Sequence, residues 1–297
     1  MKHQHCNLTK EDLQQLHILK GKTLVIKYGG SIMDNALAQE AFAEDLMLLT
    51  DIGIHIVIVH GGGPEISKWL KKTGIDSRFI NGLRVTDSDT IEIVEMVLSG
   101  SVNKKLSSNL GRKGLNTLGI SGKDSNLILA EKKYLYEKDK IIDIGFVGEI
   151  TAVNHKILLK LIENSIIPVI SPIGSDADGN SYNINADSAA AFISGSLRAE
   201  KLLIMTDIDG VYTNIKDPST LLPSITVNEI KQYTADGIIT GGMLPKLECC
   251  INALVHGTHS VHLIDGTKKH SLLFELLNAK GTKIILESEE NLCQENL

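Results

Sequence analysis

The stretch VIVHGGGPEIS, residues 57–67, runs from a β-branched apolar segment into three glycines, a proline and the start of a helix. Glycine loses much conformational entropy on folding, so a run of it indicates close approach of the backbone to another group, or a positive φ. Where a strand leads into a helix, free N–H groups and the positive helix end favour an anion. The stretch therefore predicts a buried strand whose carboxyl end binds an anionic ligand.

Strand-like and helix-like segments alternate along the chain around this stretch. Apolar runs predict strands within 23–30, 54–63, 116–122, 165–171 and 201–207, and helical periodicity covers 36–53, 87–114 and 187–197. Because the strands are continuously apolar, they predict an α/β fold with an open, mostly parallel sheet sandwiched by helices. Residues 126–152 predict short antiparallel ribbons at an edge. The Pro-, Gly-, Asp- and Asn-rich loop that follows the strand within 165–187 predicts a boundary between two lobes.

Composition narrows the class of protein. The 297 residues are 42% hydrophobic and carry a formal net charge of −6, which argues against nucleic-acid and membrane-surface partners. No apolar run approaches the roughly 20 residues of a membrane helix, and the N-terminus resembles neither a signal nor a transit peptide. Four cysteines without CxxC spacing indicate a reducing compartment. We expect a cytoplasmic protein, or one of the plastid stroma if the lysine-rich composition reflects a plastid gene.

Two common phosphate-binding motifs are absent from the sequence. Neither the P-loop pattern nor GxGxxG occurs. Instead, glycine turns are predicted at four strand ends: KYGGS at 27–31, HGGGP at 60–64, ISGK at 120–123 and TGGM at 240–243. Ligands of open parallel sheets bind beyond the carboxyl ends of the strands, so these turns favour a polyphosphate ligand.

Several charged residues stand at informative places, each with an alternative. Lys27 lies in an apolar strand and is either a phosphate ligand or half of a structural ion pair. Lys246, taken alone, is typical of a surface lysine, and Asp187 of a helix N-cap. Arg84 either grips a carboxylate or forms a surface salt bridge. HQHC at 3–6 could be a metal cluster, but we interpret it as a mobile tail and expect no metal site in the protein.

These motifs together resemble the amino-acid kinase family. The resemblance extends from Lys22 to Ile285, and the motifs that carry it are VIKYGGS, VHGGGP, GLRVTD, YNINADSAAA, TDIDGVY and GIITGGMLPKL. GLRVTD and NINAD are typical of the members that phosphorylate N-acetyl-L-glutamate. The resemblance implies the amino-acid kinase fold and transfer of the γ-phosphoryl group of ATP, with Mg²⁺, to the side-chain carboxylate of N-acetyl-L-glutamate, a step of arginine biosynthesis.

The resemblance also implies roles for matching residues. Lys27 and Lys246 would stabilise the transferring phosphoryl group, and Asp187 would orient both lysines. The acceptor would be bound by Gly62, Gly63, Arg84 and Asn183. The nucleotide would lie against Gly29, Gly30, Asp207, Gly210, Tyr212, Ile238, Ile239 and Thr240.

Assembly and regulation follow from the same resemblance. Residues 1–20 would form an inter-subunit helix, 21–172 an acceptor-binding and dimerising lobe, and 173–297 an ATP-binding lobe of a hexameric trimer of dimers. HLIDG at 262–266 resembles the effector region of arginine-inhibited members, although the arginine that usually follows this glycine is absent. Some members also bind the signalling protein PII. The alternative from a different class is a non-catalytic sensor of arginine or a nucleotide.

Overall fold

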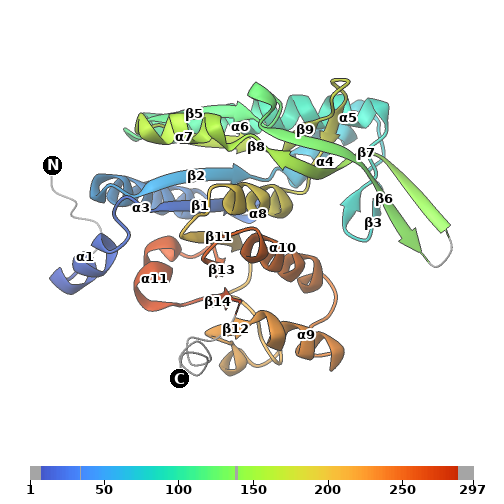
Figure 1. Cartoon of the computed structure of the whole chain (residues 1–297). Helices are drawn as coiled ribbons and strands as arrows, with labels where there is room; N and C mark the ends of the chain where they lie inside the picture. The colour runs from blue at the N-terminus through green and yellow to red at the C-terminus, as the bar shows by residue number, and fades with distance from the viewer. Residues whose placement is uncertain (1–7, 34, 138–139, 287–297) are drawn as a thin grey trace. The chain divides into compact units, whose positions relative to one another are not determined.

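The computed structural model describes residues 8–33, 35–137 and 140–286. The tail at 3–6, for which a mobile state is predicted, lies outside these residues. The chain forms two compact units, which we describe separately. The first contains residues up to Ile56 together with those from Ser194 onward, and the second contains Val57–Ile193. Figure 1 labels their helices and strands.

The first unit joins the two ends of the sequence, because strand β1 (Thr23–Tyr28) pairs in parallel with β11 (Lys201–Thr206). Its strands follow the order β12-β14-β13-β11-β1. Because of this pairing, the compact units do not begin or end at residues 20 and 172. Those residues are the boundaries that were predicted between the N-terminal helix and the two lobes. The roles expected for those segments stay predictions. The further elements of the unit are α1 (Lys10–His17), α2 (Gly30–Met33), α3 (Ala36–Ile52), η3 (Pro218–Thr220), β12 (Ser224–Thr226), α9 (Val227–Ala235), α10 (Met243–Val255), β13 (Ser260–Asp265), α11 (Ser271–Asn278) and β14 (Thr282–Ile285).

The strands of this unit are buried on both faces. Successive residues from Leu24 to Tyr28 are buried, as are those from Leu202 to Thr206, and α10 and α11 pack against β13. Successive burial, rather than alternation, confirms the prediction of a parallel sheet covered by helices on both sides. Helix α3 ends as expected at Gly53, whose φ of 92° is in the left-handed region that glycine readily adopts.

The N-terminal helix α1 packs on the first unit of its own chain. Thr9 begins the helix with a capping box, and Leu16 and Leu19 are buried. The side-chain amide of Gln15 donates hydrogen bonds to the carbonyl oxygens of Leu276 (3.3 Å) and Leu277 (3.0 Å) in α11. Helix α1 therefore packs within its own chain, and an additional contact with a neighbouring subunit stays a prediction.

The second unit contains a parallel sheet and a small barrel. Strand β2 (His55–His60), whose first two residues belong to the first unit, pairs in parallel with β8 (Ile167–Ser171), which pairs in parallel with β5 (Thr117–Ser121). Four further strands close into a barrel in the order β10-β7-β6-β9. The remaining elements are α4 (Gly63–Thr73), β3 (Phe79–Ile80), β4 (Leu83–Arg84), α5 (Ser88–Glu95), η1 (Met96–Val102), α6 (Asn103–Arg112), η2 (Asp124–Asn126), β6 (Ile128–Glu137), β7 (Lys140–Val153), α7 (His155–Glu163), β9 (Ile173–Ser175), β10 (Ser181–Asn183) and α8 (Ala186–Ser196), which crosses into the first unit.

Two sequence predictions for this unit need correction. The segment after β8 was expected to be a loop between lobes, but it contains β9 and β10. The Asp176 carboxylate accepts hydrogen bonds from the backbone N–H groups of Asp178 and Asn180, which closes a tight turn between these strands. The helix expected over 87–114 is interrupted by the π-helical segment η1. The antiparallel pairing expected within 126–152 is confirmed, although β6 and β7 are long strands of the barrel rather than short ribbons at an edge, and Figure 1 shows them as a hairpin.

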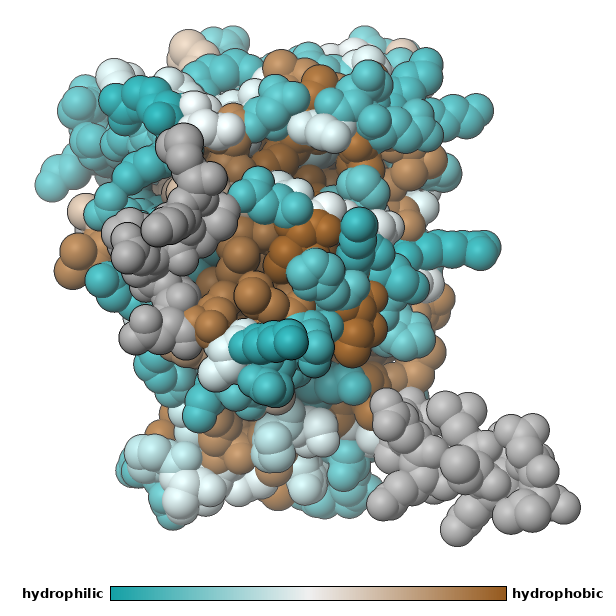
Figure 2. Space-filling model, turned by 90° about the vertical axis from the view of Figure 1, so that its left-hand side faces the viewer, coloured by the Kyte–Doolittle hydropathy of each residue, from teal (hydrophilic) through white to brown (hydrophobic). Residues whose placement is uncertain are grey.

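Hydrophobic side chains also reach the surface. On the face shown in Figure 2 they lie among hydrophilic residues. Within the part of the chain that the structure describes, every helix is too short or too polar to span a bilayer. Cys249 is partly buried and Cys250 is buried.

Candidate active site

The nucleotide-binding candidates of the first unit follow the carboxyl ends of its parallel strands. Lys27 in β1 lies opposite Ile204 of β11, and Thr206 at the end of β11 lies opposite Asp265 of β13. Gly29, Gly30 and Asp207, directly beyond these ends, therefore lie at one edge of the sheet, which is the edge where ligands of open parallel sheets bind. Lys27 is buried, with 9% of its surface exposed.

The segment after β11 combines exposed polar groups with tight packing. The Thr206 hydroxyl donates to the carboxylate of Asp207 (3.0 Å), and the Tyr212 hydroxyl donates to that of Asp209 (3.1 Å). A Cβ at Gly210 would collide with the side chain of Thr282, whose hydroxyl accepts a hydrogen bond from Val211 N–H (2.8 Å). Packing against β14 therefore suffices to explain this glycine.

The remaining candidates of the first unit precede and begin helix α10. The prediction that the TGGM turn ends a strand is wrong, because the turn lies between α9 and α10. Ile239 is buried, whereas Ile238 and Thr240 are exposed. The two glycines Gly241 and Gly242 separate Thr240 from the helix, and Lys246 lies in its first turn with its side chain partly buried.

In the second unit, the glycine turn that follows β2 is a point of close packing. A Cβ at Gly62 would lie 2.5 Å from Cδ2 of Leu98 in η1. The φ of Gly62 is 170°, an extended value, so close approach rather than a positive φ explains this glycine. Helix α4 begins at Gly63 with Pro64 in its first turn, so its first N–H groups lie directly beyond the strand.

Arg84 carries a buried charge whose hydrogen-bond partners are neutral. Only 7% of its surface is exposed, and its guanidinium lies over the Phe79 ring, 4.6 Å from the centroid. It donates to the hydroxyl oxygens of Ser77 (2.5 Å) and Ser67 (2.8 Å) and to the carbonyl of Gly63 (3.2 Å). Within residues 8–33, 35–137 and 140–286, no carboxylate pairs with it. The alternative of a surface salt bridge is therefore wrong, and burial lowers the pKa of Arg84.

Thr86 connects Arg84 with Asn183, the second expected acceptor ligand. The Asn183 amide donates to the hydroxyl of Thr86 (3.3 Å), which donates in turn to the backbone carbonyl of Arg84 (2.8 Å). The backbone of Thr86 is fixed by a hydrogen bond from Phe146 N–H to its carbonyl oxygen (2.6 Å). The structure thus brings Gly63, Arg84 and Asn183 together.

Asp187 is buried in the first turn of α8 and does not cap this helix. The side-chain oxygen Oδ1 of Asn185 accepts hydrogen bonds from the backbone N–H groups of Asp187 (2.9 Å) and Ser188 (3.0 Å). Asn185 is therefore the capping residue. The alternative role of Asp187 as the N-cap of this helix is therefore wrong.

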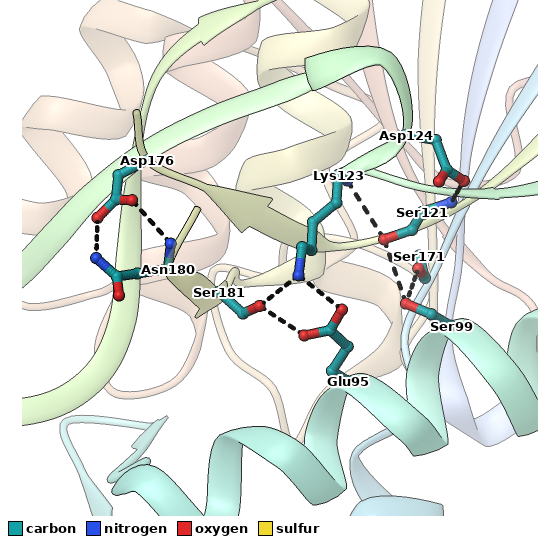
Figure 3. A network of polar contacts seen from close by, with 9 residues as sticks. All are labelled: Glu95, Ser99, Ser121, Lys123, Asp124, Ser171, Asp176, Asn180 and Ser181. Atoms are coloured by element: carbon teal, nitrogen blue, oxygen red, sulfur yellow. Dashed lines mark hydrogen bonds and ion pairs between the residues drawn. The ribbon is translucent and has the colours of Figure 1, made fainter. Parts of the chain in front are cut away.

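A polar network that sequence reasoning missed includes Ser181 (Figure 3), which lies in the same short strand as Asn183. Lys123 pairs with Glu95 (3.0 Å) and donates to the hydroxyl of Ser181 (2.7 Å), which donates to Glu95 (2.6 Å). The network joins helix α5 to the start of β10. The only sequence signal was the position of Lys123 in the glycine turn ISGK at the end of a predicted strand.

The described residues contain no cluster of three or more His, Cys, Asp or Glu side chains that could hold a metal ion.

A model of the amino acid kinase family matches residues 22–265. The chain belongs to this family, and the prediction of its fold is confirmed. An acetylglutamate kinase of Clostridium acetobutylicum is 53% identical over 279 residues, which cover 94% of this chain and 95% of the relative. A second acetylglutamate kinase, from a Sulfurihydrogenibium species, is 48% identical over 284 residues and covers 91% and 94% of the two chains. The prediction of a kinase is thereby confirmed, and a non-catalytic sensor is not favoured.

Solved structures show the same fold in an enzyme of a different name. N-acetylglutamate synthase from Neisseria gonorrhoeae, complexed with coenzyme A and N-acetyl-glutamate, gives a TM-score of 0.80 at 24% identity. The match covers 94% of this chain and 63% of the synthase. A structure of the same synthase with coenzyme A and L-arginine gives a TM-score of 0.77 at 23% identity, with coverages of 94% and 65%.

Proposed function

We propose that the protein transfers the γ-phosphoryl group of ATP to the side-chain carboxylate of N-acetyl-L-glutamate. A carboxylate oxygen forms a bond to the γ-phosphorus as the bond from this phosphorus to the β,γ-bridging oxygen breaks. The products are ADP and N-acetyl-L-glutamyl 5-phosphate. Because the attacking carboxylate is already ionised at neutral pH, the reaction requires no general base.

The observation that carries this proposal is the buried charge of Arg84. A buried cation with only neutral hydrogen-bond partners is costly, and an anionic ligand would supply the missing negative charge. Arg84 also contacts the carbonyl of Gly63 and is connected through Thr86 to Asn183. A carboxylate bound there would compensate the guanidinium charge. We assign Arg84 and Asn183 to the α-carboxylate end of the acceptor, and the N–H groups of Gly62 and Gly63 to its reacting end.

Lysine side chains supply the charge that phosphoryl transfer needs. We assign Lys27 and Lys246 to the transferring phosphoryl group, where cations stabilise developing charge, and Asp187 to their orientation. The burial of Lys27 supports this role, because a low-dielectric site strengthens its attraction for phosphate. The loop after β11 and residues Ile238–Thr240 would bind the rest of the nucleotide, and Mg²⁺ would enter on the phosphates of ATP.

Regulation by arginine is a second part of the proposal. The solved synthase with L-arginine supports it, as does the polar cluster at the HLIDG strand, where buried His262 lies 2.6 Å from Glu275. Helix α1 contacts the same helix, α11, which supports a link between the N-terminal segment and this region. The hexameric trimer of dimers and the binding of PII stay predictions.

Release of ADP in a coupled assay tests the reaction. N-acetylglutamate, glutamate, aspartate and UMP are offered separately as acceptors with ATP and Mg²⁺. We expect turnover with N-acetylglutamate and much slower release with the other three. Equal turnover with free glutamate or UMP would contradict the acceptor assignment.

A further inference from the structure

A buried histidine without an assigned role stands immediately before the glycine turn. His60 is the last residue of β2, and none of its surface is exposed. Its Nδ1 lies 2.8 Å from the carbonyl oxygen of Gly61, and its Nε2 lies 3.1 Å from Nδ2 of Asn103. Complete burial prevents the imidazole from exchanging protons directly with substrate or solvent. Its effect on the reaction must therefore act through the backbone that it holds.

The surroundings of Asn103 determine which imidazole nitrogen carries the proton. Asn103 is fully buried, and its amide nitrogen lies 2.8 Å from the carbonyl of Val169 and 3.2 Å from that of Ile120. The group that faces these two carbonyl oxygens must be a donor, so it is the amide nitrogen and not the amide oxygen. This nitrogen also faces Nε2 of His60, and because it cannot accept, Nε2 carries no proton; the two N–H groups of the amide are shared among the three acceptors. The proton is then on Nδ1, and this N–H donates to the carbonyl of Gly61.

The π-helical segment η1 brings Asn103 to this position. Asn103 follows the last residue of η1, while Leu98 within η1 packs directly on Gly62. Ser99 hydrogen bonds with the hydroxyls of Ser171 (2.8 Å) and Ser121 (3.3 Å) at the ends of β8 and β5 (Figure 3). Segments of π-helix are rare and frequently occur at functional sites. Here the segment contacts the glycine turn and the ends of β8 and β5.

Gly119 makes room for this arrangement. A Cβ at Gly119 in β5 would collide with Oδ1 of Asn103, which has no hydrogen-bond partner within the described residues. An asparagine buried with an unsatisfied oxygen is costly, and an apolar residue of similar size would avoid that cost. The contacts of the amide nitrogen with His60, Ile120 and Val169 offset part of this cost.

We propose that His60 and Asn103 are positioning residues for the acceptor. Asn103 holds the imidazole of His60 in its Nδ1–H form. His60 in turn fixes the carbonyl of Gly61, and with it the turn through Gly63. The proposal rests on the assignment of this turn to N-acetylglutamate. A fixed carbonyl at Gly61 sets the direction of the N–H groups of Gly62 and Gly63. Loss of the bond should therefore weaken binding of the acceptor and leave ATP binding unaffected.

Two substitutions of His60 each keep one of its two hydrogen bonds and remove the other. In His60→Asn, the side-chain amide can occupy the place of Nδ1 and donate to Gly61, but it loses the bond from Asn103. In His60→Gln, the amide oxygen can occupy the place of Nε2 and accept from Asn103, but the bond to Gly61 is lost. Because a buried carbonyl then lacks its donor, we expect the KM for N-acetylglutamate to be about tenfold higher in His60→Gln than in His60→Asn. The KM for ATP should be the same in both.

His256→Gln provides the matched control. Nδ1 of His256 lies 2.7 Å from a backbone carbonyl, that of Asn252, at an exposed helix end in the first unit. Its replacement removes a bond of the same type without touching the glycine turn, so both KM values should stay at the wild-type level. Equal acceptor KM values in the two His60 variants, or a parallel rise in the KM for ATP, would overturn the proposal.

The tautomer of His60 in the unmodified protein provides an independent measurement. Long-range ¹H–¹⁵N correlation spectra distinguish protonation at Nδ1 from protonation at Nε2. We expect Nδ1–H, and a proton on Nε2 would overturn the proposal even if neither variant folds. An error in the acceptor assignment would have a different signature: Arg84→Lys would leave the KM for N-acetylglutamate unchanged while the tautomer remained Nδ1–H.

Discussion

A decrease in pH should lower the free energy of unfolding of the second unit, because His60 is buried there. Burial lowers the pKa of this imidazole to about 4, well below its ordinary value near 6.5. The folded protein therefore keeps His60 neutral under conditions in which the unfolded chain takes up a proton there. The unfolded state binds more protons in this range, so the free energy of unfolding should fall as the pH decreases from about 6.5 toward 4.

The size of the effect follows from these two pKa values. At about pH 5, the unfolded imidazole is almost fully protonated and the folded one mostly neutral, which lowers the free energy of unfolding by about 2 kcal/mol. At about pH 7.5 the same contribution is below about 0.1 kcal/mol. His60→Gln has no imidazole and should lose this part of the pH dependence, whatever its stability at neutral pH.

Urea unfolding followed by tryptophan fluorescence measures the difference. Trp69, the single tryptophan of the chain, lies in α4 directly after the glycine turn and so reports on the second unit. Carboxylates common to both proteins affect the wild type and His60→Gln alike, so their contribution cancels in the comparison. If the gap in unfolding free energy between the two proteins were the same at both pH values, the reasoning from burial would be refuted.

Four further predictions concern the proposed catalytic function and its regulation. Lys27→Ala or Lys246→Ala should lower kcat far more than it raises either KM, by about 2.7–4 kcal/mol in activation free energy, and near-normal kcat would exclude that lysine. Arg84→Lys should raise the KM for N-acetylglutamate alone in steady-state assays that vary each substrate, and equal changes in both constants would contradict its role. Lys123→Met removes the ion pair to Glu95 beside β10 and should also raise the acceptor KM, whereas Lys123→Arg should restore it; failure of the rescue would indicate a packing role. Deletion of residues 1–20 should reduce the assembly to dimers and abolish inhibition by arginine, and light scattering that shows an unchanged mass, with an unchanged arginine response, would exclude this role.

The parallel strands could be predicted because their sequences are apolar without alternation. Strands β1 and β11 are buried residue after residue, which requires cover on both faces, and such strands rarely occur outside α/β sheets. The carboxyl ends of several buried strands could be predicted from the glycines that follow them. Glycines that follow a buried strand need an explanation, and at Gly62 and Gly210 the structure supplies one in close packing against another segment.

Other features depend on contacts between residues distant in the sequence. The residues on both sides of the π-helical segment within 87–114 keep helical periodicity, so the sequence pattern does not reveal the segment. It is distinguished from ordinary α-helix by contacts with distant residues: Leu98 packs on Gly62, and Ser99 contacts the ends of β8 and β5. Strands β9 and β10 are short and rich in turn residues, so their pairing with β6 and β7 decides their conformation. No local pattern carries this information.

Arg84 shows what the residue type alone can predict. An arginine at this position suggests binding of an anion, but only the structure shows which of its N–H groups are already used and whether its charge is compensated. From the sequence, a guanidinium before a helix could equally serve a surface salt bridge. In the structure, three of its five N–H donors are used by Ser77, Ser67 and Gly63, which are neutral partners. The two remaining N–H groups and the uncompensated charge can serve an anionic ligand. A lysine has only three N–H donors, and the same three neutral acceptors would use them all. If the proposed acceptor assignment holds, arginine suits this position because it can hold the glycine turn and still offer N–H donors to a carboxylate.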